Sequence, residues 1–143
     1  MTPNPIDIQA LIMAALQQSF TPERGFHVFM EQGRALADSE YPAAIITFDS
    51  GDIRPRVAGD DPRAASVVGN RYVYRYFVDI SVRNQALARL STMFDLVVAA
   101  GPLFRARSPA LLLAFEGVEG IQRTEEARDD IRSIRFRLRV EST

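Results

Sequence analysis

The stretch from Ile131 to Val140 alternates between apolar and polar residues, and this alternation constrains the fold more than any other feature of the chain. Because side chains on a β-strand point alternately to opposite faces, the segment predicts a strand with one apolar face and one row of guanidinium groups. The apolar positions are Ile134, Phe136, Leu138 and Val140, and the arginines are Arg135, Arg137 and Arg139.

Closely spaced like charges repel, so the arginine row needs carboxylates across from it. Either a neighbouring strand of the same chain supplies them or another molecule does. The candidates nearest in the sequence are Glu116, Glu119, Glu125, Glu126, Asp129 and Asp130.

Two amphipathic helices are predicted from apolar residues at helical spacing. The first begins at Asn4-Pro5-Ile6-Asp7, where Asn is a typical cap and Pro a typical first-turn residue. The second is predicted to begin after a cap at Asn84 and to end at Gly101-Pro102. Strand-like segments are separated by turn residues, and they cover 26–30, 43–48, 72–82, 118–124 and 131–140, the last two as a closing hairpin.

Two segments are harder to assign. Residues 110–115 form a short apolar run that fits either a helical turn or a buried strand. Residues 50–70 contain Gly, Pro, Asp and Arg with little periodicity, which predicts a long irregular loop.

This order of elements predicts an α+β fold in one domain over residues 1–143. We expect a single mixed or antiparallel sheet of four to five strands with both helices packed on one face, because two helices cannot cover both faces. The second face is then left to solvent or to a partner.

Composition narrows the function classes. The 17 basic residues, all arginines, nearly balance 18 acidic residues, so bulk charge does not favour binding of a polyanion. Arginine suits bidentate contacts with carboxylates, although a GC-rich genome gives the same bias. There is no cysteine, no signal-peptide pattern and no apolar run near the roughly 20 residues of a membrane span. We therefore expect a soluble protein made in a cytoplasm.

No residue pattern indicates catalysis, a cofactor or a metal, and we predict that the chain is not an enzyme. His27 is the only histidine and has no second ring or nucleophile nearby in the sequence. The serines lack a nucleophile elbow, and the glycines lack the spacing of a phosphate loop. Tyr72, Tyr74 and Tyr76 alternate as sheet-packing aromatics do, which we favour over a stacking platform for nucleic acid.

The arginine row is the main candidate site. Arg135, Arg137 and Arg139 fit a solvated sheet face with cross-strand partners, and they fit a contact between subunits equally well. In the predicted loop, a second candidate contact comprises Ile53, Arg54, Arg56 and Val57.

A family resemblance spans most of the chain. It rests on the Gly33-Arg34 turn, the acidic residues Asp38 and Glu40, the Tyr41-Pro42-Ala43 junction, and the strand, loop, strand and helix that follow. This order resembles the tail terminator proteins of long-tailed phages and related minor tail proteins of prophages and gene transfer agents.

The resemblance implies a structural virion protein without enzymatic activity. Such subunits form a ring, commonly a hexamer, on the head-proximal end of the tail tube, with DNA able to pass through it. The ring stops polymerisation of the tail tube protein and joins the tail to the neck connector. The expected location is the virion tail, after assembly in the host cytoplasm, and the loop over residues 50–70 is expected to reach a neighbouring subunit or the tube.

Two other functions remain open. One is another neck or tail-completion protein, since those share the size and pattern. The other is a small dimeric ligand-binding α+β protein that holds a metabolite between its sheet and a partner. The lack of a nucleophile–base pair argues against a hydrolase.

Overall fold

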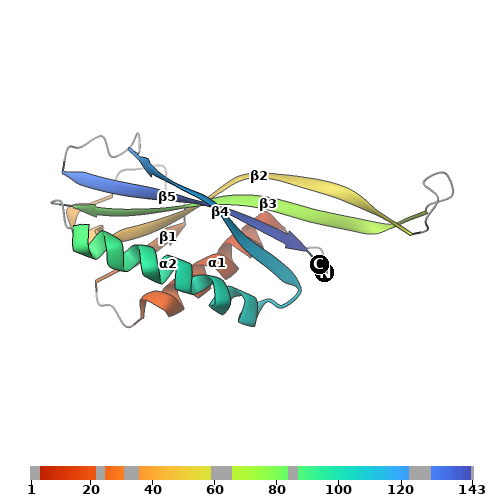
Figure 1. Ribbon diagram of the computed structural model, residues 1–143, viewed down its shortest axis with the longest axis horizontal. Helices are drawn as coiled ribbons and strands as arrows, with labels where there is room; N and C mark the ends of the chain where they lie inside the picture. The colour runs from red at the N-terminus through yellow and green to blue at the C-terminus, as the bar shows by residue number, and fades with distance from the viewer. Residues whose placement is uncertain are drawn as a thin grey trace.

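A computed structural model describes residues 4–21, 25–30, 36–58, 66–83, 87–122 and 130–142, with the backbone alone at 56–58 and 66–68. One mixed five-stranded sheet carries both helices on the same face (Figure 1). This confirms the predicted α+β fold with two helices on one side of the sheet.

The strand order in the sheet is β1-β2-β3-β5-β4. β1 runs parallel to β2, and the other neighbouring pairs are antiparallel. The elements are α1 (Pro5–Phe20), β1 (His27–Met30), the short 3-10 helix η1 (Asp38–Glu40), β2 (Ala43–Ala58), β3 (Ser66–Arg83), α2 (Leu87–Arg107), β4 (Leu111–Ile121) and β5 (Ile131–Ser142).

α1 begins as predicted. The Asn4 side chain accepts a hydrogen bond from the Asp7 backbone N–H at 2.9 Å, which satisfies one of the donors left free at a helix N-terminus. The helix is fixed to the centre of the sheet, because Gln9 Nε2 donates to the Ile46 carbonyl at 2.8 Å and Tyr76 Oη donates to the Pro5 carbonyl at 2.7 Å.

α2 is longer than predicted. It continues through Gly101-Pro102 to Arg107, so the predicted stop is wrong. A proline inside a helix costs about 3 kcal/mol, but the extra turn buries Phe104 almost completely against the sheet, which offsets most of that cost. Asn84 lies outside the described residues.

α2 is also long and apolar enough to cross a membrane, with a mean hydropathy of 1.4, whereas the sequence analysis expected no such segment. The core helix of a soluble protein can be equally long and apolar, and α2 packs on α1, where Ser19 Oγ donates to the Leu96 carbonyl. The finding is therefore weak support for a membrane location.

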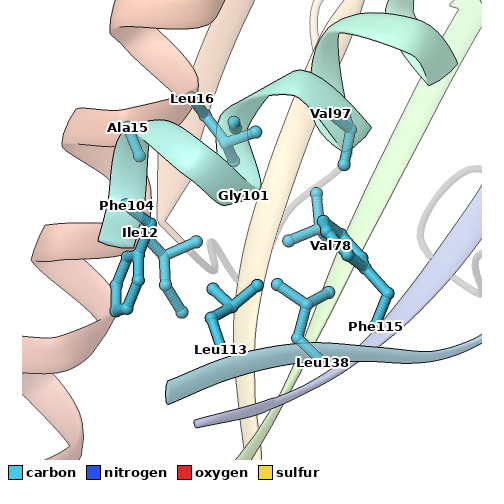
Figure 2. Close-up of a pocket in the computed structure, with 11 residues that line it drawn as sticks. Ile12, Ala15, Leu16, Val78, Val97, Gly101, Phe104, Leu113, Phe115 and Leu138 are labelled. Carbon is cyan, nitrogen blue, oxygen red and sulfur yellow. The ribbon is translucent and has the colours of Figure 1, made fainter. Parts of the chain in front are cut away.

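The main core lies between the helices and the inner face of the sheet. Tyr76, Val78 and Ile80 of β3 and Phe136 of β5 are fully buried in it, as the alternation in the sequence predicts. Figure 2 shows side chains from α1, α2 and three strands converging on a void of about 10 Å³. A metabolite site needs a few hundred Å³, so this void is packing space.

A second, smaller apolar cluster lies on the outer face. Leu36, Ala43 and Ile45 are buried there, with Phe29 and Tyr41 packed against them. The segment around η1 therefore covers the β1–β2 side of the outer face, and the rest of that face carries the charged residues of β3, β4 and β5.

The predicted irregular loop over 50–70 is wrong. β2 and β3 stay paired along most of it, with Ile53 opposite Tyr72 and Pro55 opposite Asn70, and only 59–65 lie outside the description. The two strands run past the helices as a projecting ribbon (Figure 1). We call residues 51–58 and 66–72 the β2–β3 arm.

Backbone irregularities explain why the arm did not show a strand pattern. The register shifts between Phe48 and Ser50 and again between Arg56 and Val57, and each shift breaks the period of two. Gly69 has a φ of 143°, which favours glycine. At Gly51 a Cβ would stand 2.4 Å from the Tyr74 ring, so only glycine leaves room for that ring.

β4 resolves the two remaining assignments. Residues 110–115 were open between a helical turn and a strand, and from Leu111 they are strand. The predicted closing hairpin is confirmed in its pairing of 118–121 with β5, while 123 and 124 lie outside the described residues. A bulge between Phe115 and Gly117 places Glu116 out of register.

Candidate functional site on the outer face and the arm

β5 lies between β3 and β4, so its outward side chains have neighbours on both sides. Arg135 is opposite Asp79 of β3 and Glu119 of β4, and Arg137 is opposite Phe77 of β3. The predicted row of guanidinium groups is thus present on the outer face, inside the sheet rather than at its edge.

Arg135 makes the strongest of the charge contacts. Its Nε donates to Asp79 Oδ1 at 2.8 Å and its Nη2 donates to Asp79 Oδ2 at 2.9 Å, and the Asp79 side chain is 0% exposed. The guanidinium also lies 4.2 Å from the centre of the Phe77 ring. The hydrogen bonds to Asp79 raise the pKa of Arg135 above its ordinary value, although partial burial opposes them.

Arg137 and Arg139 pair with carboxylates of the same chain. Arg137 Nη2 donates to Glu119 Oε1 at 2.6 Å. Arg139 Nε lies 2.9 Å from Glu141 Oε1 and 3.1 Å from Glu116 Oε1. Those two contacts are close enough for ion pairs, but the Nε–H is not aligned for a hydrogen bond with either oxygen.

The pairing continues across the rest of the outer face. Arg75 lies 3.2 Å from Asp52, and Arg83 lies 3.0 Å from Asp38 and 3.3 Å from Asp130. Among the described residues seven arginines face seven carboxylates, and we call this set the charge mosaic: Arg54, Arg71, Arg75, Arg83, Arg135, Arg137 and Arg139 with Asp38, Asp52, Asp79, Glu116, Glu119, Asp130 and Glu141.

The mosaic answers the question left open by the sequence. Neighbouring strands of the same chain supply carboxylates to all three predicted arginines, including Glu116 and Glu119 from the candidate list. Asp130 pairs with Arg83 instead, and Glu125, Glu126 and Asp129 lie outside the described residues. Asp79 of β3, the partner of Arg135, was not among the candidate carboxylates from the sequence.

Glu141 gives the mosaic a measurable acid sensitivity. Arg71 donates a hydrogen bond to Glu141, and this bond together with the charge of Arg139 holds the pKa of Glu141 below its ordinary value. A carboxyl whose pKa is lower in the folded state stabilises the fold above its unfolded pKa of about 4.3, and this contribution is lost as the pH falls through the folded pKa.

Replacing Glu141 by glutamine should therefore flatten the acid limb of the stability curve. We expect the wild-type chain to lose more unfolding free energy than Glu141→Gln between about pH 5 and pH 2, since only the wild type has this carboxylate to protonate. Urea unfolding followed by circular dichroism at several pH values measures it. Parallel curves for the two proteins would contradict the assignment.

The loop residues predicted as contacts lie on the β2–β3 arm. Ile53 is 63% exposed, and Arg54 is exposed beside Asp52 at 3.5 Å. Arg56 and Val57 belong to β2 by their backbone pairing. One member of each predicted group acts on the same carboxylate, because the charges of Arg54 and Arg139 both lower the pKa of Glu141.

The chemistry available to this surface is that of fixed, paired charges. Among the described residues no group of three His, Asp or Glu side chains is placed to hold a metal ion. His27 stacks on Phe29 of the same strand, β1, with 6.0 Å between ring centres, and it is not part of the mosaic.

Comparison with known proteins adds little to this. No family model matches the chain, and no curated protein does. A solved structure without a descriptive name covers 94% of this chain and 95% of its own, with 13% identity and a TM-score of 0.44. A likeness at that level carries no argument about function.

Proposed function

We propose that this chain is a structural subunit of a long-tailed phage or phage-derived particle, of the tail terminator type. It forms a ring, in our proposal a hexamer, at the head-proximal end of the tail tube. The ring stops addition of tail tube protein and joins the tube to the neck connector. The observation that carries the proposal is the β2–β3 arm, which projects beyond the helices and has no cover within the described chain.

The structure of the arm favours its binding to another protein. An isolated two-stranded ribbon is marginally stable in water and usually needs a third strand or a packed layer. β1 pairs with β2 only as far as Ile46, and β5 meets β3 only from Val73 onward, so both arm edges lack a strand among the described residues. Unpaired edges and the exposed Ile53 favour burial against another protein.

A contact between an arm and a different surface of a second copy is head-to-tail. Contacts of this kind close into rings when the rotation between copies divides a full turn. The proposed mechanism is then steric: one rim of the ring fits the last ring of the tube, and the other rim offers no surface for a further tube ring. DNA passes through the opening without sequence recognition, and no chemical step is needed.

Native mass spectrometry and negative-stain electron microscopy of the purified chain test the proposal. We expect rings, or hexamers that grow in population with concentration, and shorter tubes when the chain is added to polymerising tail tube protein. A chain that stays monomeric at all concentrations would overturn the proposal. A fixed dimer that binds a small molecule would favour the ligand-binding alternative.

The proposal also assigns the arginine row to a contact between proteins, and a charge swap tests this. Arg137→Glu places like charges together and should abolish rings, while the double variant Arg137→Glu/Glu119→Arg restores the internal pair with reversed polarity. Because both side chains are about half exposed, stability should change by less than about 1 kcal/mol.

If Arg137 contacts another subunit, the double variant folds normally but still fails to form rings. If the double variant forms rings like the wild type, Arg137 acts only within its own chain. Arg105→Glu, an exposed position on α2, is the matched control for a change of charge away from the mosaic.

A further inference from the structure

The outer edge of β4 is an open sheet edge. β4 is the last strand of the sheet, paired on one side with β5, and no described strand pairs with its other side. Its 11 residues include no lysine, arginine or proline, which commonly protect an edge, and its protection against further pairing is limited to two glutamates and the bulge at Glu116. Leu112 is more than half exposed on this strand.

An apolar ledge lies beside this edge. We use the term β4 ledge for Val98 of α2 with Phe115 and Val118 of β4, which are 46%, 37% and 51% exposed. Phe115 packs on Phe136 with 5.9 Å between ring centres, and Val118 is opposite Phe136 in the register. The ledge is therefore the uncovered margin of the main core, and an apolar side chain placed there would extend that core.

The charges of β4 and of the arm are complementary. β4 contains Glu116 and Glu119 and no basic residue, and both glutamates stay more than a third exposed after pairing within the chain. The β2–β3 arm has the opposite balance, one aspartate against three arginines: Asp52 with Arg54, Arg56 and Arg71.

We propose that the β4 edge and ledge receive the β2–β3 arm of a second copy of this chain, with Ile53 seated on the ledge. This inference rests on the proposed ring. The arm of the same copy cannot pair with this edge, because β5 lies between β3 and β4 in the sheet. Pairing of β4 with β4 of another copy would bring like-charged glutamates together, whereas the basic arm brings arginines.

A mixing experiment tests this pairing. In the arm variant Ile53→Glu and in the ledge variant Val118→Glu, each copy keeps one half of the contact intact. For each variant alone, the dissociation constant for self-association should rise by roughly tenfold or more, and the variant should stay monomeric in native mass spectrometry. An equimolar mixture should form one-to-one dimers that do not grow, because only one intact contact remains.

Controls separate folding from contact. Ile6→Glu alters an exposed residue of α1 that belongs to neither surface and should leave rings intact. Val98→Glu on α2 should repeat the effect of Val118→Glu without a change to β4, and circular dichroism verifies folding of each variant.

A failure of the proposed docking can be distinguished from a failure of the proposed ring. Rings formed by Val118→Glu and Val98→Glu, or a mixture that stays monomeric, would overturn the docking of the arm on β4 and leave the proposed ring standing. A wild-type chain that never associates would overturn both.

Discussion

Replacing Arg135 by methionine is expected to lower the free energy of unfolding by about 3 to 5 kcal/mol. The Asp79 carboxylate is 0% exposed and accepts two hydrogen bonds from Arg135, so removal of the guanidinium leaves a negative charge buried without that compensation. Urea unfolding followed by circular dichroism at neutral pH measures the loss.

Two further variants make the result specific. Arg137→Met removes an ion pair of which both members are about half exposed, and it should cost less than about 1 kcal/mol. The double variant Asp79→Leu/Arg135→Met removes both charges and should be more stable than Arg135→Met alone. If Arg135→Met and Arg137→Met lower the free energy of unfolding by the same amount, the buried Asp79–Arg135 pair contributes no more to stability than the exposed pair of Arg137.

Phe136→Ala is expected to lower the free energy of unfolding by about 3 to 5 kcal/mol. Phe136 is buried where β5 meets α2 and β4, with its ring centre 4.9 Å from that of Phe94 and 5.9 Å from that of Phe115. Truncation removes these contacts and leaves a cavity that the sheet, held by β3 and β4, cannot close.

Thermal or urea unfolding measures this loss as well. Val118→Ala is the matched control, because Val118 faces the same side of β4 opposite Phe136 but is half exposed, and it should change stability by about 0.5 kcal/mol or less. A loss below about 1 kcal/mol for Phe136→Ala would show that the core repacks around the missing ring.

The fold class followed from two alternating segments. Residues 72–82 and 131–140 each place apolar side chains on one face, and both became central strands of the sheet with those side chains in the core. With only two amphipathic helices available, one face had to remain free of helices. These inferences needed only the periodicity of the side chains, which the sequence displays directly.

The arm and the end of α2 could not be predicted in the same way. Bulges next to Phe48 and Val57 and the positive φ of Gly69 interrupt the period of two, so a paired strand looked like an irregular loop. Pro102 is a local signal to end a helix, but burial of Phe104 two residues later offsets most of the cost of that proline. In both places pairing or packing with distant residues overrides the local signal.

The charge mosaic was half predictable. The alternation identified the three arginines and their common face, but their partners depend on the strand register. A shift of one residue would have moved Asp79 to the core face, and Glu116, which pairs with Arg139, lies at a bulge that no single-strand pattern indicates. Single-strand patterns do not contain that information.

The balance of the mosaic has a consequence for kinetics. Because its arginines and carboxylates are equal in number and interleaved, their fields cancel beyond a few ångströms, and this face exerts little long-range attraction on an approaching protein. Encounters through it would proceed without long-range electrostatic steering, so the complementary charges of β4 and the arm would act only once the two surfaces are in contact.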